Sequence, residues 1–153
     1  MDRLVLCSAW GSDVVAPLAQ ALQELGAGPL RWLAAGDPAA QLLPGPERLL
    51  ALAKDQELVD WVEFLASNRQ ACLLALPHAA RLRAEAALHH ALLDRAGVPL
   101  LGLLQVGGTW EPAQRRADGL PWLGHWPTGD LQALQDLLPL LRIRWRQLDL
   151  PRA

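Results

Sequence analysis

The sequence predicts an α/β fold, a three-layer sandwich in which a mostly parallel sheet of five or six strands carries helices on both faces. Hydrophobic residues make up 52% of the 153-residue chain, which is enough to bury the core of one domain over residues 1–153. Short apolar runs without alternation recur along the chain, as strands buried on both faces require. Helical segments separate these runs at intervals of about 25 to 45 residues, which is the pattern of βαβ units.

The first strand and helix are expected at the start of the chain. Residues 4–9 are an uninterrupted apolar run, which favours a buried strand. Residues 11–13 form a turn with capping side chains, and a helix is expected over residues 14–25. Pro17 fits only the first turn of that helix, and Gly26 ends it.

A second strand is expected over residues 30–35, followed by a loop that extends to Pro46. Because proline suits the first position of a helix, a helical region is expected over residues 47–66, and residues 54–56 are where it could break. Trp61 would lie on the apolar face of this region.

The second half of the chain continues the alternation. We expect strands at 71–76, 99–106 and 120–126, helices at 80–96 and up to 138, a polar loop or short helix at 110–118, and a helix end at Pro139. Arg115 and Arg116 lie in the polar segment and are expected to be solvated.

The spacing of the apolar residues changes toward the end of the chain. Apolar residues alternate there with arginines, in the order Leu141, Arg142, Ile143, Arg144, Trp145, Arg146. A period of two predicts a strand with one buried face. The arginines on its outer face would protect a sheet edge from pairing with another strand.

Composition excludes several classes of protein. The net charge of −2 argues against a nucleic-acid binder. No apolar run reaches the roughly 18 residues of a membrane span, and the start of the chain does not resemble a signal peptide. We therefore expect a cytoplasmic protein that does not enter a membrane. Cys7 and Cys72 lie in apolar strand runs and are expected to be reduced and unreactive.

Ligands of open α/β sheets bind beyond the carboxyl ends of the strands. The expected strands bring eight residues to that edge, where they would contact a ligand or a partner: Trp10, Ser12, Asp13, Asp37, His78, Trp110, His125 and Trp126. The alternative is that these are ordinary loop residues, with indoles covering the strand ends. This placement assigns no catalytic residue.

Motifs for metal binding and nucleophilic catalysis are weak. His78 and His125 are the only histidines placed to share a metal ion, and we predict neither a metal nor a cofactor. Ser12, Asp37 and His125 could be drawn as a triad, but the nucleophile elbow Gly-x-Ser-x-Gly is absent.

The first expected helix contains Leu18-Ala19-Gln20-Ala21-Leu22, and a later segment reads Gly119-Leu120-Pro121-Trp122-Leu123-Gly124. Together with residues 72–77 and 97–103, these segments resemble the P-loop NTPases related to dethiobiotin synthetase and the MinD/ParA group. In that family a strand leads through a Gly-rich loop ending in Gly-Lys-Thr to a helix of this type. The resemblance implies the same parallel α/β fold.

The phosphate-binding residues of that family have no counterparts in this chain. A P-loop needs backbone amides around the phosphate, a lysine on the β- and γ-phosphates and a Ser or Thr on magnesium. The turn at residues 10–13 is several residues too short and lacks lysine, and Asp13 stands where phosphate charge would sit. The only lysine, Lys54, lies in another segment.

Three functions remain as hypotheses. The first is a non-catalytic P-loop-like protein that acts in binding, assembly or regulation without hydrolysing ATP. The second is a small hydrolase or transferase that uses the crevice at the carboxyl ends of the strands, with His78 or His125 as base. The third is a nucleotide binder with a non-standard loop.

The positions of the tryptophans predict a binding partner. The core can bury the four that fall in expected strands and helices, namely Trp32, Trp61, Trp122 and Trp145. The other three, Trp10, Trp110 and Trp126, fall in turns at the carboxyl edge. Because they would together form an exposed apolar patch, we expect this edge to contact a second copy, a partner protein or a flat apolar ligand.

Overall fold

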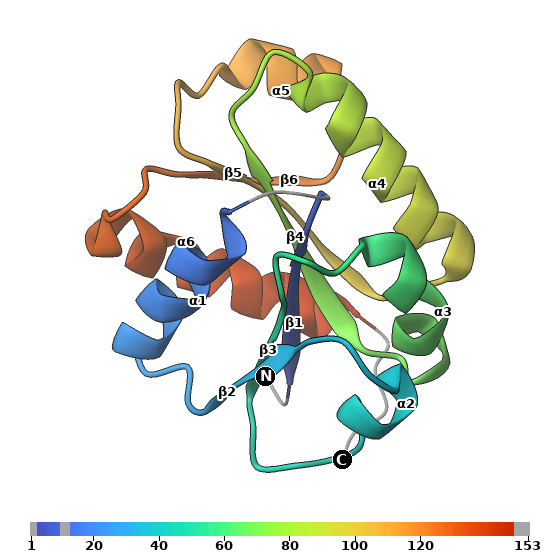
Figure 1. Ribbon diagram of the computed structural model, residues 1–153. Coiled ribbons are helices and arrows are strands. Elements are labelled where there is room, and N and C mark those ends of the chain that lie inside the picture. The colour runs from blue at the N-terminus through green and yellow to red at the C-terminus, as the bar shows by residue number, and fades with distance from the viewer. Residues whose placement is uncertain (1–2, 10–12, 149–153) are drawn as a thin grey trace.

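The computed structural model describes residues 3–9 and 13–148, which alternate between strands and helices throughout (Figure 1). The strands are β1 (Leu4–Ser8), β2 (Leu30–Leu33), β3 (Leu49–Leu52), β4 (Ala71–Pro77), β5 (Leu100–Val106) and β6 (Trp122–Trp126). The helices are α1 (Val15–Glu24), α2 (Pro38–Gln41), α3 (Leu58–Ser67), α4 (Leu82–Ala96), α5 (Pro112–Ala117) and α6 (Leu131–Gln147).

The six strands form one sheet in the order β2-β3-β1-β4-β5-β6, and every neighbouring pair is parallel. β1 lies at the centre, where Val5 stands opposite Leu50 of β3 and Cys72 of β4. Because all strands point the same way, their carboxyl ends meet at one edge. The predicted α/β class is confirmed.

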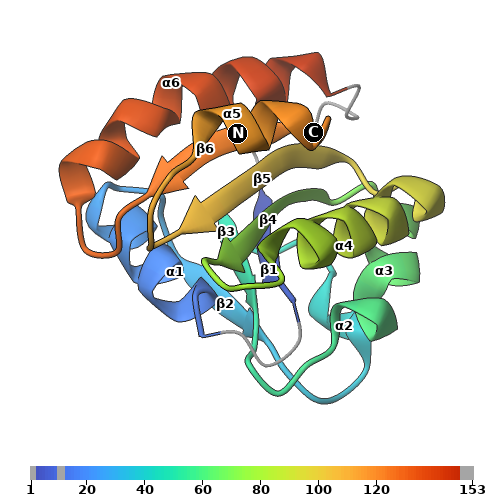
Figure 2. The ribbon, with the colours of Figure 1, turned by 90° about the horizontal axis from the view of Figure 1, so that it is seen from above.

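Helices cover both faces of the sheet (Figure 2). Leu4 and Leu6 of β1 pack in a cluster with α1 and α6, whereas Val5 and Cys7 pack in a second cluster with α3 and α4. Successive side chains of a strand point to opposite faces, so a strand between two helix layers must be apolar at every position. This requirement explains the uninterrupted apolar runs.

The predicted strand at residues 141–146 is wrong, because these residues form the second half of α6. Leu141 is buried and Trp145 half-buried, whereas Ile143 is 52% exposed. Burial therefore recurs every four residues, which is the helical period. Pro139 does not end the helix but lies inside it, on the exposed side where water can reach the carbonyl group that loses its partner.

The predicted helix over residues 47–66 is also wrong in its first part. Leu49–Leu52 form β3, all four residues are buried, and the helix begins only at Leu58. Leucine and alanine favour helices in isolation, but this short segment lies between β1 and β2 in the sheet and pairs with both strands. The sheet thus has six strands, and the sixth is β3 rather than the end of the chain.

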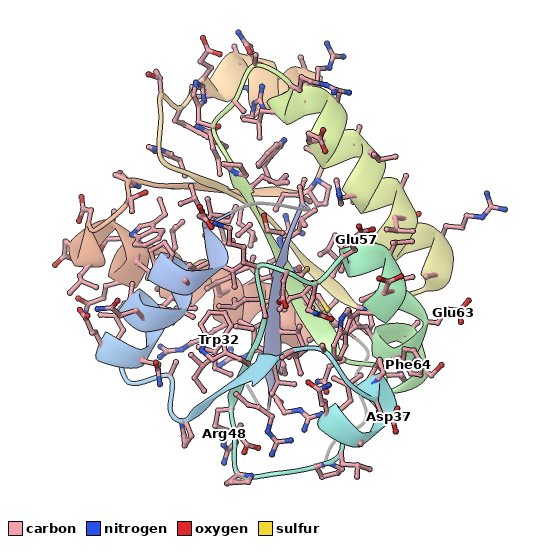
Figure 3. The ribbon with its side chains drawn as sticks, viewed as in Figure 1. Trp32, Asp37, Arg48, Glu57, Glu63 and Phe64 are labelled. Atoms are coloured by element: carbon pink, nitrogen blue, oxygen red, sulfur yellow. The ribbon has the colours of Figure 1, made fainter. Side chains whose placement is uncertain are left out.

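The environment of Trp32 also differs from the prediction. It lies on β2, the outermost strand of the sheet, and is 42% exposed instead of buried (Figure 3). Trp61, by contrast, is 1% exposed and packs in the cluster of α3 and α4, as expected.

The two cysteines are fully buried in the cluster that faces α3 and α4. Burial, and then the neighbouring Cys7 thiol, raise the pKa of the Cys72 thiol well above its usual value. Within residues 3–9 and 13–148, every helix is too short or too polar to span a bilayer.

Candidate functional site

The carboxyl edge of the sheet divides into two regions, and the predicted site residues are shared between them. Asp13 and Asp37 lie near the ends of β1, β2 and β3, while His78, Trp110 and His125 lie around the ends of β4, β5 and β6. Trp10 and Ser12 fall outside the described residues. The chain passes from β1 and β6 to helices on one face of the sheet, and from β4 to a helix on the other face. In open sheets, crevices form between neighbouring strands whose chains leave toward opposite faces, as β1 and β4 do.

Asp13 forms an ion pair with Lys54, with its Oδ1 atom 2.7 Å from the Lys54 Nζ atom. Asp13 stands two residues before the first residue of α1, and Lys54 follows the neighbouring strand β3. Both side chains are about two-thirds exposed or more, so the pair contributes at most about 1 kcal/mol to stability. Its importance is its position, since a carboxylate stands at the helix end that would otherwise attract an anion.

Asp37 has a local structural role. Its Oδ1 atom accepts a hydrogen bond from the backbone N–H of Ala39 at 3.0 Å, which caps the four-residue helix α2 (Figure 3). The Asp37 carboxylate is therefore engaged by its own loop.

Gln105 organises the other region. This residue is 1% exposed, and its Nε2 atom donates to the carbonyl oxygens of Gly107 and Thr109, each at 3.0 Å. The same nitrogen lies 3.4 Å from Nδ1 of His78. One buried amide thus holds the loop after β5 in a fixed turn and brings it beside the imidazole that follows β4.

Glycine is required at the tip of this turn. Gly108 has a φ of +66°, and a Cβ atom at this position would overlap the ring of His78. The backbone of the loop therefore lies directly against the imidazole, which a side chain would prevent.

His125 borders the loop from the side of β6. Its Nε2 atom lies 3.1 Å from the carbonyl oxygen of Gly107. Since a carbonyl group only accepts hydrogen bonds, this nitrogen carries the proton when the bond forms. The indole of Trp110 stacks on the imidazole, with the ring centroids 6.1 Å apart and the planes at 12°.

The aromatic contacts continue from Trp110 to α5. Trp110 meets Trp122 edge to face at 6.1 Å, and the guanidinium carbon of Arg115 lies 5.2 Å from the centre of the Trp122 ring. Arg115 also pairs with Asp118 at 3.3 Å. The expected solvation of Arg115 is therefore wrong, because these contacts leave it only 7% exposed.

A cavity of about 290 Å³ opens between this loop and the starts of α4 and α5. Its polar and charged lining residues are His78, Arg83, Gln105, Thr109, Glu111, Gln114 and Arg115. Asp118 pairs with both Arg83 and Arg115, each at 3.3 Å. The lining therefore carries charges of both signs, which suits a polar ligand better than a purely anionic one.

Trp126 lies elsewhere. It is the last residue of β6, is 1% exposed, and packs in the cluster beneath α1 and α6. Its indole N–H donates to the carbonyl oxygen of Asp130 at 2.9 Å. The expectation that Trp126 adds to an exposed apolar patch is wrong, because its indole packs into the core from the end of β6.

Two residues of this region were missed from the sequence. Gln105 is the only polar side chain within the apolar run of β5, and that position was a usable signal of a buried role. Arg115 gave no such signal, because its neighbours in the sequence are polar.

The described residues contain no group of three or more His, Cys, Asp or Glu side chains that could hold a metal ion. His78 and His125 each engage the loop at residues 107–109 instead. Comparison of the sequence with protein-family models and with curated proteins gives no match.

Proposed function

We propose that this protein is a non-catalytic, P-loop-like α/β protein that acts by binding, in assembly or regulation, without hydrolysing ATP. The observation that carries the proposal is the ion pair between Asp13 and Lys54. A P-loop protein binds a nucleoside triphosphate through positive charge at the start of the helix after the first strand. Here a carboxylate stands at that place, and it neutralises the chain's only lysine.

Thermal unfolding with and without nucleotide tests this proposal. Binding to the native state alone would raise stability by RT ln(1 + [L]/Kd), about 2.7 kcal/mol at a ligand concentration of about one hundred times Kd. We expect millimolar Mg-ATP and Mg-GTP to leave the melting temperature unchanged. A saturable shift with Kd below about 100 μM would overturn the proposal. If Lys54→Ala removed that shift, the protein would be a nucleotide binder with a non-standard loop.

The proposal includes the surface through which the protein binds. Gly108, Thr109 and His78 are exposed around the fixed turn after β5, and the half-buried indole of Trp110 lies beside them. A rigid loop with an aromatic neighbour loses little conformational entropy on association. We take a second copy of the chain as the partner to test.

Sedimentation velocity of the purified protein tests self-association. We expect a concentration-dependent dimer that Thr109→Arg weakens, because a new charge at the interface must be desolvated. Val59→Arg is the matched control, since Val59 is 53% exposed on α3 and far from the loop in the chain. A wild-type protein that remains monomeric at about 100 μM would exclude a second copy as the partner at that concentration.

The cavity of about 290 Å³ beside His78 favours one other candidate, a small hydrolase or transferase. In such an enzyme His78 would act as the base, positioned by the loop that Gln105 holds. Hydrolysis of a p-nitrophenyl ester would then fall to the background rate in His78→Asn. Equal rates for the wild type and the variant would exclude this role for His78.

A further inference from the structure

A second cavity, of about 460 Å³, lies at the amino ends of the strands, at the opposite end of the sheet from the candidate site. It is enclosed by the end of α1, the start of β1, the start of β3 and the second half of α6. The volume lies within the range of roughly 300–1,000 Å³ that is usual for small-molecule sites.

The floor of this cavity is apolar. Leu4, Leu22, Leu49 and Leu141 line it and are each 5% exposed or less, and the indole of Trp145 forms part of the wall. The carbonyl groups at the end of α1 are already bonded, because Leu22 accepts from Ala27 and Ala21 accepts from Leu25. The floor therefore offers hydrocarbon rather than unpaired polar groups to a ligand.

The rim of the cavity carries positive charge. Arg48, Arg142 and Arg146 line it, and none of its lining residues in the described part of the chain is acidic. Arg142 and Arg146 are one helical turn apart on α6 and share a face, whereas Arg144 projects from another side and does not line the cavity. The carboxylates of residues 3–9 and 13–148 form no ion pair with Arg142 or Arg146.

We propose that this cavity binds a small organic carboxylate with an apolar hydrocarbon body. The hydrocarbon would displace water from the leucine-lined floor, and the carboxylate would lie at the rim between the guanidinium groups of Arg142 and Arg146. Guanidinium groups bind carboxylates with two parallel hydrogen bonds, and the guanidinium groups of Arg142 and Arg146 would repel a cationic ligand. This site is independent of the proposed function at the carboxyl edge.

Calorimetric titration of the full chain with three eight-carbon probes tests the proposal, namely octanoate, 1-octanol and octylammonium. We expect saturable binding of octanoate, at least about tenfold weaker binding of 1-octanol, and no saturable binding of octylammonium. Equal affinity for the three probes would overturn the proposal, because the arginine rim would then contribute nothing. Absence of octanoate binding at about 10 mM would overturn it as well.

Variants of α6 separate a specific site from general adsorption. Arg142→Gln with Arg146→Gln should weaken octanoate binding by about tenfold or more, because both charged partners are removed. Arg144→Gln lies between them on the same helix and should leave the affinity unchanged. Ala27→Leu, which fills the cavity from the end of α1, should weaken octanoate and 1-octanol alike. Equal loss in Arg144→Gln and in the double variant would contradict the assigned rim.

Discussion

Gln105 holds the loop after β5 at the carboxyl edge of the sheet. Its amide donates to the carbonyl groups of both Gly107 and Thr109, and His125 donates to that of Gly107 as well. Those carbonyls fix the turn against which His78 and His125 rest. A buried polar side chain within an apolar strand thus positions the surface that we propose binds a partner.

Replacing this amide tests its role. Gln105→Leu removes the side-chain donor of the Thr109 carbonyl group and one of the two side-chain donors of the Gly107 carbonyl group, and we expect the free energy of unfolding to fall by about 1–3 kcal/mol. Urea denaturation measures this change. Gln20→Leu is the control, because Gln20 is exposed on α1 and bonds only Glu24, so a change within about 0.5 kcal/mol is expected. Equal stability of Gln105→Leu and the wild type would contradict the role given to Gln105.

The buried thiol of Cys72 makes stability depend on pH. Its pKa is raised by burial and by Cys7, whereas an unfolded thiol ionises near pH 8.5. Above that pH the unfolded state releases a proton that the native state retains, so stability falls as pH rises. The chain contains no tyrosine and one lysine, so few other groups titrate in this range.

We expect the free energy of unfolding to fall by up to about 1.4 kcal/mol per pH unit above pH 8.5 because of Cys72. Urea denaturation between about pH 7 and pH 10, in the presence of a reductant, measures this slope. Cys72→Ala lacks this thiol, so its free energy of unfolding should fall less steeply with pH. Parallel slopes for the two proteins would show that the Cys72 thiol ionises equally in both states.

At the scale of elements, α6 is unusual because Pro139 interrupts a 17-residue helix near its middle. Proline removes one backbone hydrogen bond and crowds the preceding turn. The helix continues because Leu134, Leu141 and Trp145 hold its apolar face against the sheet on both sides of the proline. Tertiary packing therefore outweighs a local preference to stop.

Pro139→Ala is expected to stabilise the protein by about 1–3 kcal/mol, since it restores a hydrogen bond in a helix that already exists. Thermal or urea denaturation measures the gain. Pro112→Ala is the matched control, because Pro112 stands in the first turn of α5, where proline costs nothing. A loss of stability in Pro139→Ala would mean that a kink at this position is needed for packing.

The sequence predicted most elements, but it left the four-residue helix α2 within an expected loop and assigned two further segments wrongly, for identifiable reasons. β3 is four residues long and rich in Leu and Ala, so its composition favoured a helix, and only its neighbours β1 and β2 make it a strand. At residues 141–146 two periods fit the same apolar residues. The exposure of Ile143 decides between them, and exposure is not visible in a sequence.

For the whole molecule, the parallel topology predicts that the carboxyl ends of the strands meet at one edge, but not which loops lie beside one another there. His78 and His125 come from strand ends 47 residues apart in the chain, and the structure brings both to the loop after β5. The pairing of Asp13 with Lys54 was not predicted, because Lys54 was assigned to a helical region rather than to the end of a strand beside β1. Side-chain partners depend on strand order, and strand order was not deduced.

The central proposal is that this parallel α/β sheet carries no nucleotide chemistry. The most direct test is release of inorganic phosphate from Mg-ATP and Mg-GTP by the purified protein, compared with protein-free buffer and with Lys54→Ala. We expect all three rates to be indistinguishable, because Asp13 engages the only lysine and, in the proposed P-loop-like fold, would stand where the phosphate charge binds. Phosphate release that is faster with the wild type than in buffer, and that Lys54→Ala abolishes, would contradict the claim.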